Sequence, residues 1–137
     1  KIVSFLETEI SRNDLAAKVH MPGIVTGAAK ATLYRRATVF VQPSEHENFG
    51  MSVAEATLFG KACIVNKGVG LSEDIVASQA GLSYNGHISE LESTLRKMLS
   101  SEQLRLSCEK EAIKLSKNFD SITIAKNLKF QYERILK

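Results

Sequence analysis

Two glutamates flank a Phe-Gly pair at the start of an expected helix. In the stretch "EHENFGMSVAEA", residues 45–56, Glu47 precedes Phe49 and Gly50, and Glu55 follows them. The first backbone N–H groups of a helix carry partial positive charge and suit phosphate oxygens. A carboxylate can accept two hydrogen bonds from a vicinal diol such as ribose. The pattern indicates a ligand with phosphate and hydroxyl groups, or else two surface acids stabilised near a helix start by about 0.3 to 1 kcal/mol.

The order of these residues suggests an order of ligand groups. Gly50 has no side chain, so a phosphate or sugar could approach the backbone there, and the N–H groups from Gly50 to about Val53 would face it. Glu55 lies about one turn into the helix, where its carboxylate could hold ribose. Glu47 lies in the loop, where it could hold hydroxyls beyond the phosphates. We therefore expect ribose, diphosphate and sugar to follow one another across this segment.

The elements that must position this segment alternate between helix and strand. Apolar spacing predicts a helix from Ile2 to about Lys18 and a short strand and turn in "VHMPGIV", residues 19–25. The next expected elements are helix 27–37, strand 38–43, helix 51–60, strand 62–66 and a weaker strand 81–85. Three helices follow: one opened by a Ser89-x-x-Glu92 capping box, one from Ser101 to about Lys117, and one from Asp120 or Ser121 to the end. The last helix is expected to pack through Ile122, Ala125, Leu128, Tyr132 and Ile135.

The expected strands are continuously apolar, as in parallel sheets covered by helices on both faces. We therefore predict the α/β class, a Rossmann-like doubly wound parallel sheet flanked by helices. Ligands of such sheets bind beyond the carboxyl ends of the strands, and the loop between strand 38–43 and helix 51–60 leaves from that edge.

Composition fits a globular chain. Its 137 residues, 44% hydrophobic and 24% charged, can form a core without disulfides or metals. No apolar run approaches the roughly 18 to 20 residues of a membrane span. Cys63 and Cys108 lie in apolar settings without metal-like spacing, which favours buried thiols in a reducing, cytoplasmic setting. The chain begins with Lys1 and shows no secretory signal, so we expect a fragment of a longer protein.

Charge and histidine placement favour no nucleic-acid or metal partner. The positive excess lies in the last third, where Lys110, Lys114 and Lys117 share a helical face without interleaved aromatic residues. The three histidines have neither metal-ligand spacing nor a triad order. We expect no nucleic acid, metal or cofactor.

The stretch "VFVQPSEHENFGMSVAEATLFGKACIV" closely resembles the signature of the retaining nucleotide-sugar glycosyltransferases of GT-B architecture, family four (group 1). That family carries a "PS…EGFG…EA…G.PV" segment in which seven residues separate two glutamates, as they separate Glu47 and Glu55. The resemblance continues more weakly in "YRRATVFVQPS", "GVGLSEDIV" and "FQYERIL", so it covers most of the chain. Asn48 replaces the usual Gly and Ala62 the usual Pro, which affects loop shape more than chemistry.

The resemblance implies a role for each position of the segment. The implied contacts are Glu47, Phe49, Gly50 and Met51 for the donor sugar; Gly50, Met51 and Ser52 for phosphate; Glu55 for ribose; Gly23, Ile24 and Val25 for the base; and Glu73 for a further contact. The base positions come from the turn "PGIV" and match less specifically. Glu73 could equally be an ordinary acid in the first turn of a helix.

The resemblance also implies what lies outside the chain. Residues 1–137 would be a single nucleotide-sugar-binding domain, the C-terminal half of a GT-B fold from a longer two-domain enzyme. The basic residues that clamp the diphosphate and the acceptor-binding domain would precede it. No catalytic residue is therefore assigned within the chain, and the chain alone is expected to be inactive.

The implied partners are a UDP- or GDP-sugar donor and the missing N-terminal acceptor domain. The full-length protein would be cytoplasmic and could associate peripherally with the inner face of the membrane. Two alternatives stay open: a sugar-nucleotide epimerase of the same architecture, which would need further acid and base residues, and a non-catalytic α/β interaction module in which the glutamates are incidental.

Overall fold

The computed structural model describes residues 2–136 and divides into two compact units, Lys1–Lys30 and Ala31–Lys137. The first unit contains helix α1 (Ile2–Arg12), and the second contains the whole β-sheet. Helix α2 (Gly27–Arg36) begins in the first unit and ends in the second. The expectation of a single domain over residues 1–137 stays a prediction.

The first unit departs from the sequence prediction in two places. Helix α1 ends at Arg12 and not near Lys18, because Asp14 adopts a left-handed backbone with φ of 59°. Residues 19–25 form no strand. Pro22 cannot donate to a ladder, Gly23 turns the chain with φ of 71°, and the Ile24 side chain is 96% exposed.

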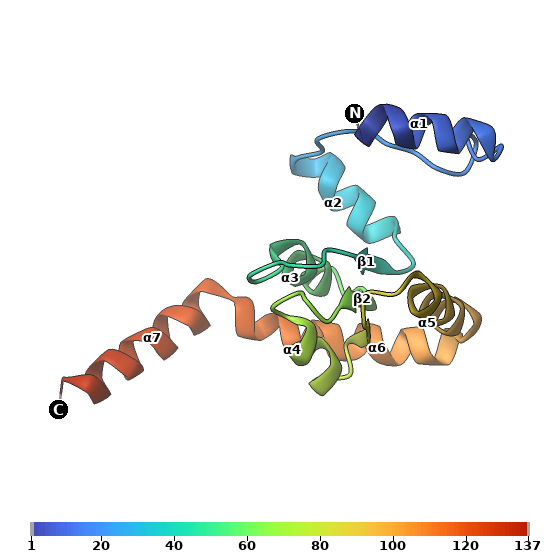
Figure 1. Ribbon diagram of the computed structural model, residues 1–137. Helices are drawn as coiled ribbons and strands as arrows, with labels where there is room; N and C mark the ends of the chain where they lie inside the picture. The colour runs from blue at the N-terminus through green and yellow to red at the C-terminus, as the bar shows by residue number, and fades with distance from the viewer. Residues whose placement is uncertain (1, 137) are drawn as a thin grey trace. The chain divides into compact units, whose positions relative to one another are not determined.

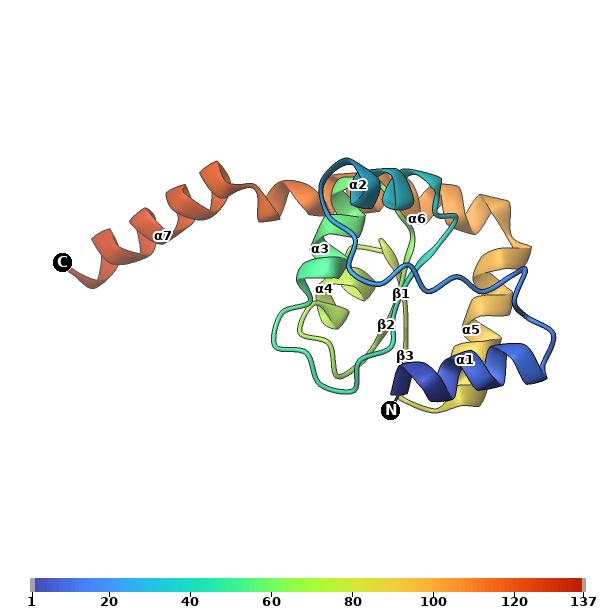
Figure 2. The same cartoon turned by 90° about the horizontal axis from the view of Figure 1, so that it is seen from above.

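The second unit is built on three parallel strands, β1 (Phe40–Gln42), β2 (Cys63–Asn66) and β3 (Gly81–Tyr84), in the order β1-β2-β3. Val41 pairs with Ile64, and Ile64 pairs with Leu82. Figure 2 shows the strands between α3 (Met51–Leu58) and α4 (Ser72–Ala77) on one side and α5 (Ile88–Ser100) on the other. The predicted α/β class with a parallel sheet flanked by helices is confirmed.

Two apolar clusters form the core of this unit. Val53, Val65 and Ile75 are fully buried on the side of α3 and α4, while Ile64 and Met98 are fully buried on the side of α5. Helix α6 (Glu102–Ser116) contributes side chains to both clusters. Both cysteines are free and buried, as predicted. Burial raises the pKa of the Cys63 thiol to about 12 and also raises the pKa of Cys108.

The start of α5 differs from the predicted capping box. His87 is the N-cap residue, so Ser89 and Glu92 already lie inside the helix. The carboxylate of Glu90 accepts a hydrogen bond from the Asn85 N–H at 2.8 Å. Glu92 instead forms an ion pair with Arg96 one turn later. The acid that closes the turn before α5 is therefore two residues earlier than expected.

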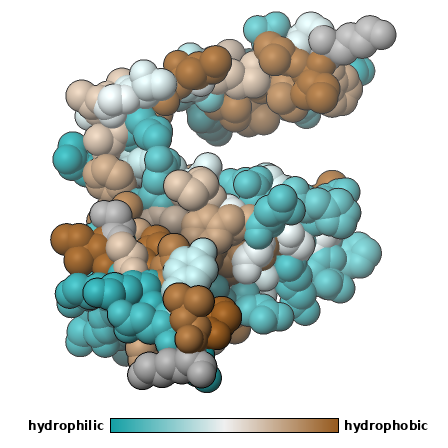
Figure 3. Space-filling view, turned by 90° about the vertical axis from the view of Figure 1, so that its left-hand side faces the viewer, coloured by the Kyte–Doolittle hydropathy of each residue, from teal (hydrophilic) through white to brown (hydrophobic). Residues whose placement is uncertain are grey.

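The last helix, α7 (Ser121–Ile135), follows the 3-10 helix η1 (Lys117–Phe119) and leads away from the rest of the second unit (Figure 1). The side chains of Ile122, Leu128 and Ile135 were predicted to pack, but they are 62%, 53% and 77% exposed. Figure 3 views the molecule along α7, where apolar and hydrophilic surface lie side by side. The predicted packing is wrong for the described residues because only η1 makes extensive contact with α7. In residues 2–136, no helix has the length and apolarity needed to span a membrane.

Candidate functional site

The predicted site begins where β1 ends and α3 starts, at the carboxyl edge of the parallel sheet. Residues 43–50 form the connecting loop, and Gly50 is the N-cap residue of α3. Gly50 has φ of 95°, and a Cβ atom added there would lie 2.8 Å from Cγ1 of Val69. Both its backbone conformation and the contact with Val69 require glycine at this position.

The loop is held by main-chain hydrogen bonds to the turn that follows β2, residues 67–71. The Glu47 N–H donates to the Gly68 carbonyl at 3.1 Å, and the Gly70 N–H donates to the Glu47 carbonyl at 2.8 Å. The Leu71 N–H donates to the Phe49 carbonyl at 3.0 Å. These bonds fix the backbone of the loop at Glu47 and at Phe49, just before Gly50.

Two glycines allow this close approach. A Cβ atom on Gly68 would lie 1.7 Å from the Glu45 carbonyl oxygen, and one on Gly70 would lie 2.1 Å from that of Asn48. Neither distance leaves room for a side chain, because the obstructing atoms belong to the backbone. Neither glycine was among the predicted site residues. The signal was present in "GVG" directly after an apolar strand, where a close backbone approach is a common reason for glycine.

The N-terminus of α3 offers backbone donors without a side-chain cap. The N–H groups of Gly50, Met51 and Ser52 donate to no other group in the described part of the chain. The N–H of Val53 was predicted to be available as well, but it donates to the Gly50 carbonyl at 2.9 Å. The first turn carries no acidic residue. This terminus can accept an anion because its partial positive charge is neither capped nor neutralised.

Glu55 lies farther along α3 and is held by a tyrosine. The Tyr34 hydroxyl donates to Oε2 of Glu55 at 3.0 Å and lies 3.2 Å from the Ser52 carbonyl oxygen. Tyr34 comes from the end of α2, within the second unit, and is only 9% exposed, whereas Glu55 is half-buried. The predicted ribose-binding carboxylate therefore has a fixed orientation toward α2.

Aromatic packing and burial define the state of Tyr34. Its ring stacks on Phe59 with centroids 5.2 Å apart and lies 5.7 Å from Phe40. Burial, followed by the hydrogen bond to the Glu55 carboxylate, raises the pKa of Tyr34 to about 12. The hydroxyl thus remains a donor at physiological pH. Tyr34 belongs to the stretch "YRRATVFVQPS" but was not among the predicted site residues.

The predicted sugar contacts are accessible to different degrees. Glu47 is half-buried, the Phe49 side chain is 42% exposed, and Met51 is 64% exposed. The Phe49 ring meets Phe119 edge to face, with centroids 5.8 Å apart. Phe49 is therefore partly anchored in the second unit, while Met51 extends into solvent.

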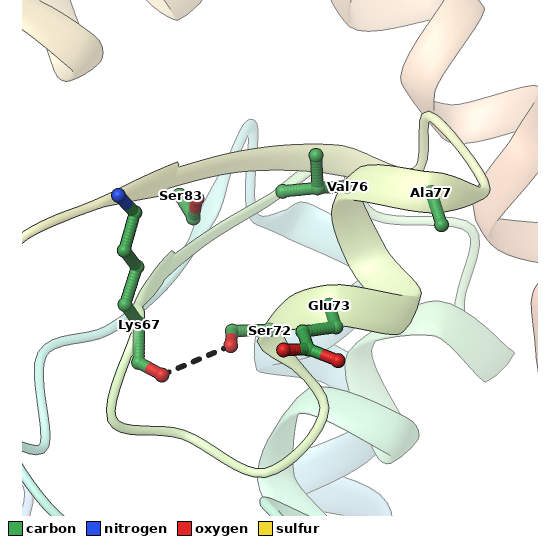
Figure 4. Close-up of a pocket in the computed structure, with 6 residues that line it drawn as sticks. All are labelled: Lys67, Ser72, Glu73, Val76, Ala77 and Ser83. Carbon is green, nitrogen blue, oxygen red and sulfur yellow. Dashed lines mark hydrogen bonds between the residues drawn. The ribbon is translucent and has the colours of Figure 1, made fainter.

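Glu73 lines a pocket of about 410 Å³ beside α4, together with Lys67, Ser72 and Ser83 (Figure 4). The Ser72 hydroxyl donates to the Lys67 carbonyl at 3.0 Å and closes the turn after β2. Glu73 lies in the first turn of α4 and is exposed. This position agrees with the alternative interpretation of Glu73 as an ordinary acid at the start of a helix. The pocket lining does not include Glu47 or Glu55.

Gly23, Ile24 and Val25 belong to the first unit. Gly23 has open space around it, and Ile24 is almost fully exposed. Their role in binding a base stays a prediction. No cluster of three or more metal-ligating side chains occurs among residues 2–136.

One protein family matches most of the chain. The model of the family described as Glycosyl transferases group 1 matches residues 3–115. The N,N'-diacetylbacillosaminyl-diphospho-undecaprenol alpha-1,3-N-acetylgalactosaminyltransferase of Campylobacter jejuni is 32% identical over 106 residues, which are 77% of this chain and 28% of that protein.

A sucrose-phosphate synthase structure from Thermosynechococcus elongatus superposes with a TM-score of 0.82 at 22% identity, covering 96% of this chain and 33% of that one. This likeness supports the fold. The chain therefore spans about a third or less of the length of these relatives.

Proposed function

The chain belongs to the glycosyl transferases group 1, and from this membership we propose that it is the part of a retaining glycosyltransferase that binds the nucleotide-diphosphate sugar donor. The observation that carries the proposal is the start of α3. There, the free N–H groups of Gly50, Met51 and Ser52 lie at the carboxyl edge of a parallel sheet, and in the sequence they fall between Glu47 and Glu55.

The diphosphate of the donor binds at these N–H groups. The helix terminus favours negative charge, and the first turn of α3 has no acid to oppose it. When the bond between the sugar and the diphosphate breaks, negative charge grows on the departing diphosphate. Fixed backbone donors stabilise that charge without having to reorganise.

The two glutamates bind the two ends of the donor. Glu55 accepts hydrogen bonds from the ribose hydroxyls, and Glu47, in the loop before Gly50, accepts them from the transferred sugar. Phe49 and Met51 add exposed contact surface beside that sugar. The donor is a UDP- or GDP-sugar, and the sugar moves to an acceptor hydroxyl with its anomeric configuration retained.

The acceptor belongs to the rest of a longer enzyme. The chain covers 28% of the Campylobacter jejuni relative, whose name describes transfer to a lipid-linked diphosphate. We extend the proposal to a two-domain cytoplasmic enzyme that binds the membrane surface peripherally, and co-sedimentation of that enzyme with lipid vesicles tests this part. The 137-residue chain alone lacks the second wall needed to exclude water, so it transfers no sugar.

Titration calorimetry of the chain with UDP and with GDP tests donor binding. We expect saturable binding of at least one nucleotide. Glu55→Ala should weaken it by about tenfold or more, because a hydrogen bond to a charged group contributes about 1.5 to 3 kcal/mol. Glu92→Ala is the matched control, since Glu92 is an exposed acid on α5 paired only with Arg96 in the described residues.

Absence of binding for both nucleotides would contradict the proposal and favour the non-catalytic interaction module. Equal affinity of the wild-type chain and the Glu55→Ala variant, with both folded by circular dichroism, would remove Glu55 from the site. Sugar-nucleotide turnover by the chain alone would contradict the two-domain part of the proposal.

A further inference from the structure

Tyr34 is a buried polar residue that the proposed donor site does not use directly. Its hydroxyl lies among apolar rings and reaches two groups of α3, the Glu55 carboxylate and the Ser52 carbonyl. A buried hydroxyl without a partner is costly, so the single proton of Tyr34 goes to one of these two acceptors. Of the two acceptors, the Glu55 carboxylate lies nearer, at 3.0 Å against 3.2 Å for the Ser52 carbonyl, and its charge makes it the stronger acceptor.

Several contacts keep Tyr34 in place. Its ring stacks on Phe59, and the Arg35 guanidinium lies 5.4 Å from the centre of the same Phe59 ring. The Lys61 ammonium donates to the Arg35 carbonyl at 3.0 Å, which ties the end of α2 to the connection between α3 and β2. Stacking of the Tyr34 ring and the contact to the neighbouring backbone of α2 thus hold Tyr34 in place, so that its hydroxyl can orient the Glu55 carboxylate.

A half-buried glutamate on a helix has several side-chain rotamers, and only some direct its oxygens toward a ligand at the helix N-terminus. A carboxylate offers about four acceptor positions, and the hydrogen bond from Tyr34 occupies one of them. We propose that Tyr34 is a positioning residue that fixes the Glu55 carboxylate for recognition of the ribose hydroxyls of the donor nucleotide. This inference rests on the proposed function, because it assigns the ribose to Glu55.

The test is Tyr34→Phe, which removes the hydroxyl and keeps the ring. We expect the dissociation constant for UDP or GDP to rise roughly threefold to tenfold, the range for one lost hydrogen bond near a charge. The dissociation constant for the matching 2′,3′-dideoxynucleoside diphosphate should change by less than about twofold, because that ligand has no ribose hydroxyls for Glu55 to bind. A purely structural role would weaken both ligands equally.

Tyr84→Phe is the matched control. Tyr84 is also a buried tyrosine, but it lies on β3 in the cluster that faces α5, away from α3. This variant should leave the affinities for both ligands unchanged. Thermal unfolding of each variant shows whether the fold is retained before affinities are compared.

A double-mutant cycle separates this inference from the proposed function. If Tyr34 acts through Glu55, adding Tyr34→Phe to Glu55→Ala should weaken nucleotide binding no further. If Glu55→Ala weakens binding while Tyr34→Phe leaves it unchanged, or weakens both ligands equally, the positioning role is wrong and the donor site stands. If Glu55→Ala has no effect, the ribose assignment fails and the positioning role fails with it.

Discussion

The two glutamates of the proposed donor site are held by opposite means. Glu47 lies in a loop fixed through main-chain hydrogen bonds to the turn 67–71, where Gly68 and Gly70 permit backbone contact. Glu55 lies on a helix and is fixed through its side chain, by the hydroxyl of Tyr34. The position of the loop thus relies on the absence of side chains at Gly68 and Gly70, whereas the orientation of Glu55 involves the side chain of Tyr34.

The loop and the Glu55 side chain are therefore sensitive to different substitutions. The hydrogen bonds of Glu47 and Phe49 to the turn use backbone atoms, whereas a Cβ atom on Gly68 or Gly70 would collide with the backbone of the loop. The Glu55 carboxylate, in contrast, accepts a side-chain hydrogen bond from a phenol, which is sensitive to substitution and protonation of Tyr34.

The largest expected effect comes from Gly68→Ala. A Cβ atom there would lie 1.7 Å from the backbone oxygen of Glu45, so the loop or the turn must move. We expect the free energy of unfolding, measured by urea denaturation, to fall by about 3 kcal/mol. Nucleotide affinity should fall as well, because the same loop sets the position of Gly50.

Gly86→Ala is the control for this prediction. Gly86 has φ of 81°, and its added Cβ atom would meet only an Asn66 side-chain nitrogen at 3.7 Å. Its cost is therefore backbone strain alone, about 1 kcal/mol. If the two variants lose equal stability, close approach of the loop to the turn 67–71 is not what holds Glu47.

The next effect is pH-dependent and concerns the Glu55 region alone. The folded-state pKa of Tyr34 is raised from 10.0 to about 12, with burial as the largest cause. The stability that comes from keeping this phenol protonated is fully present below about pH 10 and is lost as the pH rises through about 12. We expect the difference in unfolding free energy between the wild-type chain and Tyr34→Phe to change by about 2 kcal/mol over this interval.

Glu55→Gln sharpens this result. The hydrogen bond and the charge of Glu55 are secondary causes of the raised pKa of Tyr34, so the substitution should lower that pKa but leave it above its ordinary value of 10.0. Ultraviolet titration of tyrosinate, with Tyr34→Phe subtracted, measures it. An unchanged pKa would mean that the Tyr34 hydroxyl is not coupled to Glu55.

The sequence predicted the elements with apolar regularity well. Strand β2 lies within the expected residues 62–66, and α3 starts where Gly50 ends the loop. These predictions depend on burial, which apolar residues reveal directly. The strand predicted for residues 19–25 does not form, because Pro22 and Gly23 disrupt strand pairing. A short apolar run without such residues would favour a strand.

The candidate site was predicted only in part for a related reason. The types and spacing of Glu47 and Glu55 pointed to hydroxyl groups of a ligand, whereas the partners that hold them depend on tertiary contacts. Tyr34 precedes Glu55 by 21 residues, and the Gly68 carbonyl accepts from Glu47 across a complete helix and strand. Spacing within one segment carries no information about such partners, so they appear only once the chain is folded.

The smallest expected effect separates the two glutamates by ligand. Glu47 contacts the turn 67–71 through its backbone, so Glu47→Ala should keep the loop and remove only the carboxylate. We therefore expect the affinity for bare UDP or GDP to stay within about twofold of wild type. Affinity for the sugar-bearing donor should fall about tenfold, which corresponds to about 1.4 kcal/mol for one lost hydrogen bond to a charge.

Calorimetry with both ligands on both proteins, at one salt concentration, measures this difference. Glu45→Ala is the matched control, because Glu45 is an exposed acid of the same loop without an assigned ligand contact. Equal loss for the two ligands would mean that Glu47 shapes the phosphate-binding turn, and no loss for either would make it a surface acid. In the full-length enzyme the same substitution should also lower kcat, because a misplaced anomeric carbon reduces the rate as well as the affinity.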